Sequence, residues 1–181
     1  MLTRRETFAG FALSLGFVSS GIAGQVWAAA PTPGWTPVAL TPDQARTLDV
    51  VAELIVPATD TPGARAVGVP QFIDRWVRDW CSPAQGKLLR SGLDQLDADA
   101  RTANGAGFAD LSPAQQTALL TRYDTAGDPQ RPFFGLVKEL TTIGYFTSKP
   151  GATVALRYDP VPGDYRGCVP LKEIGRAWAT S

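Results

Sequence analysis

Apolar residues recur along this chain at intervals of three and four, the spacing that places them on one face of an α-helix. The pattern predicts five helices, over residues 41–56, 70–80, 82–96, 112–124 and 132–145. The side chains expected to face a core are Leu48, Val51, Ala52, Ile55, Phe72, Ile73, Trp76, Val77, Trp80, Leu88, Leu89, Leu93, Leu96, Ala118, Leu119, Tyr123, Phe133, Leu136, Val137 and Leu140. The chain is therefore predicted to be mainly α.

Three of these helices begin with the same signal, a hydroxyl residue followed by proline and, two positions later, by glutamine. The three copies are Thr41-Pro42-Asp43-Gln44, Ser82-Pro83-Ala84-Gln85 and Ser112-Pro113-Ala114-Gln115. The hydroxyl can accept a hydrogen bond from the amide of the glutamine, whose side chain can return to the first amide. Proline suits the first helical position, so each copy predicts a capped helix start.

The helical pattern ends near Gly144, and proline, glycine and aromatic residues dominate the rest of the chain. Residues 146–181 are predicted to form an extended tail, with a turn or two over residues 152–156 and a short last helix through Ile174 and Trp178. Such a tail either wraps the domain's own core or lies across another protein. Residues 41–181 are thus expected to form one small helical domain with an extended C-terminal segment.

The first thirty residues read as a twin-arginine export signal. Arg4 and Arg5 precede Phe8 and a weakly apolar run diluted by glycine and serine, and small residues follow, with cleavage expected after Ala28 or Ala30. A membrane anchor is the alternative, but the run falls short of the ~20 predominantly apolar residues that span a bilayer. We expect residues 1–30 to direct export to the periplasm through the twin-arginine translocase, and residues 31–40 to be a linker.

Composition removes several kinds of chemistry. The chain has no histidine, which excludes the usual Ser-His-Asp and Cys-His catalysis, and it has no glycine-rich phosphate loop. Its two cysteines, Cys81 and Cys168, are too few for a zinc or iron–sulfur site. In an exported protein they are expected to form a disulfide, with two free thiols as the alternative. No catalytic, cofactor-binding or metal-binding residue is predicted.

Charge argues against a nucleic-acid partner. The chain has 17 basic and 17 acidic residues, and loss of Arg4, Arg5 and Glu6 with the signal leaves 15 and 16, a net charge of −1. Proteins that bind nucleic acid through its phosphates carry an excess of basic residues.

Two separated groups of residues resemble the gluconate 2-dehydrogenase subunit 3 family. The first is Glu53–Ala64 followed by Val69–Asp74; the second is Gly144–Ser148, then Leu156–Gly163 and Tyr165–Cys168. They occur in the family's order behind a twin-arginine signal, and the resemblance spans about Leu40 to Trp178.

The resemblance implies a role without chemistry of its own. Members of this family are small subunits of membrane-associated dehydrogenases that oxidise sugars, sugar acids or glycosides. Their large subunit is a flavoprotein of the glucose-methanol-choline type that carries FAD, frequently accompanied by a cytochrome c subunit with haem c. The small subunit assists folding of the large one and supplies its export signal. The substrate is then a property of the large subunit.

Eight residues follow from the resemblance as candidates for the contact with the partner: Asp60, Thr61, Pro62, Tyr145, Phe146, Arg157, Tyr158 and Tyr165. Arg and Tyr are enriched at interface hot spots. The alternatives are structural: Pro57 ends a helix, residues 59–63 form an ordinary polar turn, and Arg157 belongs to a buried ion pair.

Two other functions stay open at this point. One is a free-standing periplasmic binding or scaffolding module without an associated enzyme. The other is a hydrolase with paired carboxylates, Glu53 with Asp60 or Asp74, although nothing in their spacing requires it.

Overall fold

The protein is mainly helical in a computed structural model, which describes residues 34–161, 163 and 168–179. The elements are α2 (Pro42–Ile55), α3 (Val69–Asp79), α4 (Pro83–Asn104), the 3₁₀ turn η1 (Phe108–Asp110), α5 (Pro113–Asp124), α6 (Arg131–Phe146), the π-helical turn η2 (Gly151–Ala155) and α7 (Leu171–Ile174). No β-strand occurs among the described residues. The predicted fold class and all five main helices are confirmed.

All three predicted capping boxes are present. Thr41 Oγ1 accepts a hydrogen bond from the Gln44 amide at 3.2 Å, and Gln44 Oε1 accepts one from the Thr41 amide at 3.1 Å. The starts of α4 and α5 repeat this arrangement with Ser82 and Ser112. Each box pairs two amides that a helix start otherwise leaves without an acceptor.

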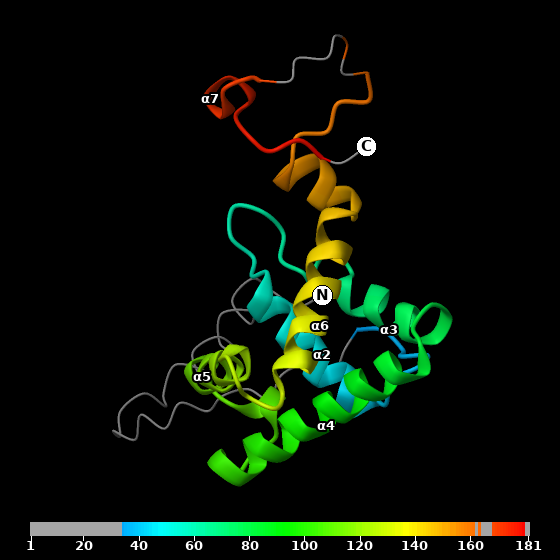
Figure 1. The fold of residues 1–181 in the computed structure, drawn as a ribbon, viewed down its shortest axis with the longest axis vertical. Coiled ribbons are helices and arrows are strands. Elements are labelled where there is room, and N and C mark those ends of the chain that lie inside the picture. Colours follow the sequence, from blue (N-terminus) through cyan, green and yellow to red (C-terminus); the bar gives the residue numbers. More distant parts are fainter. Residues whose placement is uncertain (1–33, 162, 164–167, 180–181) are drawn as a thin grey trace, which may run out of the picture.

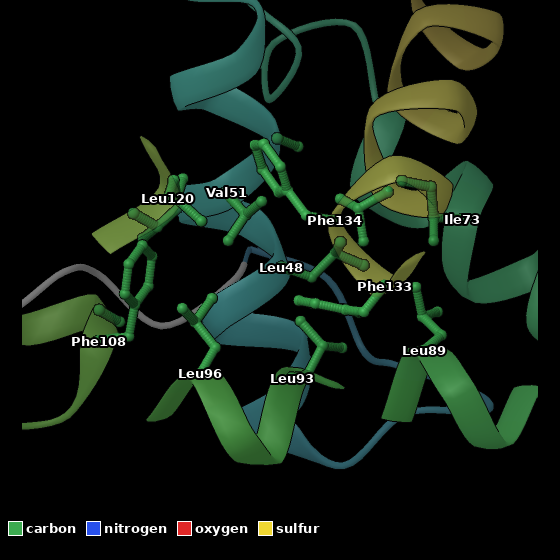
Figure 2. Packing of buried hydrophobic residues seen from close by; sticks show 14 of the residues in the cluster. Leu48, Val51, Ile73, Leu89, Leu93, Leu96, Phe108, Leu120, Phe133 and Phe134 are labelled. Carbon is green, nitrogen blue, oxygen red and sulfur yellow. The ribbon is translucent and has the colours of Figure 1, made fainter. Parts of the chain in front are cut away.

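Helix α6 lies at the centre of the helical body, in contact with α2, α3, α4 and α5 (Figure 1). Figure 2 shows Leu48 of α2, Leu93 of α4 and Phe133 of α6 pointing toward one another in the core. All three are buried, as the apolar spacing predicts. Helices α4 and α6 approach so closely at Gly92 that an added Cβ would lie 2.1 Å from the Phe133 ring.

Two residues that were expected in the core, Trp80 and Ala118, are exposed. The Trp80 side chain is 81% exposed, whereas Trp76, one turn earlier, packs partly buried against the core. Trp80 is the C-cap residue of α3, so the helical period that places Trp76 no longer determines where Trp80 points.

The terminal helix is shorter than predicted and does not include Trp178. Helix α7 ends at Ile174, because Gly175 takes a left-handed φ of 82°, and Trp178 instead forms an isolated parallel bridge with Arg157. Arg157 N donates to Ala177 O and Ala179 N donates to Arg157 O, both at 2.8 Å. The described part of the tail thus closes on itself beyond the C-terminal end of α6, instead of wrapping the helical core (Figure 1).

The expected disulfide is absent from the structure, in which Cys81 and Cys168 are both free. Cys81 lies between α3 and α4, where its thiol donates to Val77 O at 3.1 Å. Cys168 is exposed in the tail, which Figure 1 shows far from the α3–α4 junction.

No helix among the described residues combines the length and the apolar character needed to cross a bilayer. The predicted signal residues Arg4, Arg5, Phe8, Ala28 and Ala30 lie outside the described residues.

Candidate functional site

The loop between α2 and α3, residues 56–68, is held by one carboxylate at the end of α2. Glu53 Oε1 accepts a hydrogen bond from the Ala58 amide at 3.1 Å, and Glu53 Oε2 accepts one from the Arg65 amide at 2.9 Å. A single side chain therefore joins two points of the loop that are seven residues apart. Both are charge-assisted hydrogen bonds, which are stronger than those between neutral groups.

Glycine is required at position 63 of this loop. A Cβ there would lie 2.2 Å from Glu53 Oε1 and 2.7 Å from the Ala58 amide nitrogen. Gly63 thus lets the backbone pass directly against the carboxylate.

A second carboxylate of α2 binds the same loop from one turn earlier. Asp49 is buried, and its Oδ2 lies 2.5 Å from Arg65 Nε. Burial raises the pKa of Asp49 above its ordinary value, and the charge and hydrogen bond of Arg65 offset this only in part. Asp49 and Glu53 are four residues apart, so they lie on the same face of α2.

Tyr145 of α6 fixes the loop from its other side. Its ring is buried, and its hydroxyl donates to Pro62 O at 2.8 Å and lies 3.2 Å from Thr61 Oγ1. The neighbouring Phe146 packs edge-on against it, with 5.2 Å between ring centroids, and remains 40% exposed. Tyr145 is therefore an internal anchor, and Phe146 is the residue of this pair that is available at the surface.

The loop, the end of α6 and the tail enclose an open groove of about 570 Å³. Pro57, Asp60 and Thr61 line it from the loop, Tyr145 and Phe146 from α6, and Leu156 and Arg176 from the tail. Its lining is mainly apolar, with one acidic and one basic side chain. Four residues predicted from the two halves of the sequence, Asp60, Thr61, Tyr145 and Phe146, therefore meet at one surface.

Arg157 and Tyr158 lie beside this groove rather than in it, lining a smaller hollow of about 370 Å³ with α7. The guanidinium of Arg157 lies 4.4 Å from the centroid of the Trp178 ring, and Nη1 donates to Ile174 O at 3.2 Å. Arg157 is exposed. The alternative of a buried ion pair is therefore wrong, and the residue closes the tail through a cation–π contact. Tyr165 lies outside the described residues.

The carboxylates considered for a hydrolase have structural partners. Asp74, which is 2% exposed, accepts hydrogen bonds from the amides of Val38, Ala39 and Leu40 at 2.7, 3.0 and 2.9 Å. Both carboxylate oxygens of Glu53 accept hydrogen bonds from amides of the α2–α3 loop. Neither Glu53 nor Asp74 lines the groove that Asp60 lines, so the groove does not bring together the carboxylates considered for a hydrolase.

Among residues 34–161, 163 and 168–179, no cluster of three or more histidine, cysteine, aspartate or glutamate side chains could hold a metal ion. A further hollow of about 270 Å³ lies between α2, α5 and α6, over Ile55, Leu120 and Phe134. It contains none of the predicted site residues.

Sequence reasoning did not single out Asp49, and it named Glu53 only in the family motif and in a hydrolase pair, not as a residue that holds the loop. Their four-residue spacing was visible, but only the fold shows that their face of α2 turns toward the loop. The hydroxyl of Tyr145 has no local signal at all, because its partners lie more than eighty residues away.

The comparisons with known proteins point to one family. The family model described as Gluconate 2-dehydrogenase subunit 3 matches residues 42–163, which include α2 to η2 and most of the groove. No curated protein and no solved structure matches the chain.

Proposed function

Because the chain belongs to the gluconate 2-dehydrogenase subunit 3 family, we propose that it is the non-catalytic small subunit of a periplasmic flavoprotein dehydrogenase. The family's description is that of one subunit in a larger dehydrogenase complex. The proposed partner is a large subunit of the glucose-methanol-choline type that carries FAD and oxidises a sugar, sugar acid or glycoside. The family match over residues 42–163 is the observation that carries this proposal.

The groove supports a location for the contact. An interface core combines exposed apolar and aromatic side chains with a few polar groups on a rigid support. Phe146 provides an exposed aromatic ring, Asp60 an exposed carboxylate, and the α2–α3 loop is bonded on both sides. We therefore propose that the large subunit docks over the groove and the adjoining face of the tail.

The tail, which contributes Leu156 and Arg176 to the groove, also carries exposed apolar side chains. Its exposed large apolar side chains are Val154, Tyr158, Val161, Leu171 and Trp178. Contiguous exposed apolar surface typically marks an interaction site. Because Arg157 and Trp178 close the tail, part of its ordering cost is met before the partner arrives.

We further propose that the chain escorts the large subunit through the twin-arginine translocase. The signal residues Arg4 and Arg5 support this, since this pathway exports folded proteins and a folded pair can cross as one cargo.

Replacing Arg4 and Arg5 with lysine tests the escort. Both proteins are expected to stay in the cytoplasm, as read by immunoblots of periplasmic and cytoplasmic fractions. A twin-arginine substrate unrelated to this complex serves as the control and keeps its export. Continued export of the large subunit in the variant would remove the escort role.

A further inference from the structure

We propose that Glu53 is a positioning residue that sets the α2–α3 loop in the shape that docks on the large subunit. The inference rests on the proposed function, and it adds a residue that does not itself line the groove. The contacts of Glu53, Gly63 and Tyr145 restrict the loop to few conformations.

The two oxygens of Glu53 are both committed to the loop. One binds the amide at the start of the loop, at Ala58, and the other binds the amide near its end, at Arg65. A glutamine in this place has only one acceptor oxygen, and its NH₂ group would face an amide that also donates. Glu53→Gln therefore keeps the size of the side chain and breaks one of the two attachments.

Gly63 takes part in the same attachment from the side of the loop. Its Cα faces Glu53 Oε1 so closely that a methyl group cannot fit without moving the carboxylate or the loop. Gly63→Ala should therefore disturb the same attachment through a different residue. Glu53→Gln removes a charge and Gly63→Ala does not. If both variants have the same effect, the effect comes from the attachment and not from the lost charge.

The attachments through Glu53 and Tyr145 hold the exposed part of the loop in position for contact with the large subunit. Residues 57–60 are exposed, whereas Gly63 and Ala64 are buried and the Tyr145 hydroxyl holds Pro62. A loop that is ordered before binding loses less conformational entropy on docking, so its affinity is higher. If the docking shape is populated only in part, the apparent affinity falls by that fraction.

The chain offers a matched control in Asp97 of α4. Its Oδ1 accepts a hydrogen bond from the Phe108 amide at 2.9 Å, and a Cβ on Gly107 would lie 2.7 Å from that oxygen. Asp97 therefore holds a loop through one oxygen by the same kind of hydrogen bond, while its other oxygen pairs with Arg101. Figure 1 shows the end of α4 at the opposite end of the helical body from the α2–α3 loop.

The experiment compares the full chain with the variants Glu53→Gln, Gly63→Ala and Asp97→Asn. Each is tagged and expressed in the native host, and the affinity for the co-purified flavoprotein subunit is measured after separation. Amide hydrogen exchange at Ala58 and Arg65 is followed in the same full-length chains. Glu53→Gln and Gly63→Ala should weaken binding on the order of tenfold and speed exchange at these two amides, while Asp97→Asn changes neither.

Three results would overturn the inference, and they differ from a failure of the proposed function. Binding by Glu53→Gln as tight as wild type would remove the role of Glu53. Equal losses in Glu53→Gln and Asp97→Asn would make the effect one of general stability. Unchanged exchange at Ala58 and Arg65 would show that Glu53 does not order the loop. If the wild-type chain binds no flavoprotein, the proposed function fails and the docking role fails with it.

Discussion

Two acidic side chains of this protein hold backbone segments in place by accepting hydrogen bonds from their amides. Asp74 and Glu53 together accept five amide hydrogen bonds, from the segment before α2 and from the α2–α3 loop. The sequence alone also leaves open a hydrolase pair that uses these residues, although their spacing does not require it. The ambiguity cannot be removed locally, because the amides of Val38 to Leu40 lie more than thirty residues from Asp74.

Replacement of Asp74 should be costly. Asp74→Ala leaves three amides without their acceptor in a largely buried place, so we expect the free energy of unfolding to fall by about 3 kcal/mol. Urea unfolding of the chain measures this. Asp60→Ala is the control, since Asp60 is exposed and accepts a hydrogen bond from the Thr59 hydroxyl, and it should cost less than about 0.5 kcal/mol. Similar costs for the two variants would contradict the role assigned to Asp74.

Asp49 predicts a pH dependence of stability. Burial raises its pKa in the folded state, so folded protein holds the proton more tightly than unfolded protein, and ionisation lowers stability as the pH rises through the raised pKa. Asp49→Asn has no such loss. The free energy of unfolding of the variant, relative to wild type, should therefore increase between pH 4 and pH 7. A difference that stays constant or decreases would show that the pKa is not raised.

At the scale of elements, local signals were sufficient to predict the helices. The capping boxes and apolar spacing lie within a few residues of the helices they specify, so α2, α4 and α5 begin where expected. The two misplaced tryptophans lie just beyond the helices whose local signals were used to place them. Trp80 sits just past α3, and Trp178 is placed by a bridge to Arg157, twenty-one residues earlier.

Two glycines test the packing of α4 against α6. A Cβ on Gly92 would overlap the Phe133 ring, so Gly92→Ala should lower the free energy of unfolding by about 1–3 kcal/mol. Gly135 of α6 has open space around its Cα, and Gly135→Ala should raise it by about 0.5–1 kcal/mol through the better helix propensity of alanine. Thermal unfolding followed by circular dichroism measures both, and a stabilised Gly92→Ala would contradict the close contact.

At the scale of the whole molecule, the groove joins motifs from both ends of the sequence. The resemblance indicated that residues 60–62 and 145–146 act in one interface, but only the fold places them side by side, through the hydroxyl of Tyr145. The course of the tail was not predictable, since proline and glycine fix where helices stop and not where the chain turns next.

Two exposed residues of α6 locate the docking face. Phe146, 40% exposed, lines the groove, whereas Ile143, 45% exposed, does not. Phe146→Ser should reduce the amount of large subunit recovered with the chain several-fold, because it removes an aromatic contact, and Ile143→Ser should not. Quantitative mass spectrometry of the purified complexes measures both. The reverse pattern would place the interface on another face of α6.

The most direct test of the account is purification of the tagged chain from its native host in mild detergent, read by mass spectrometry and by flavin absorbance. The account predicts recovery of a large glucose-methanol-choline type subunit with bound FAD. A colourless, single polypeptide, from a preparation in which other complexes remain intact, would contradict it and favour a free-standing binding module.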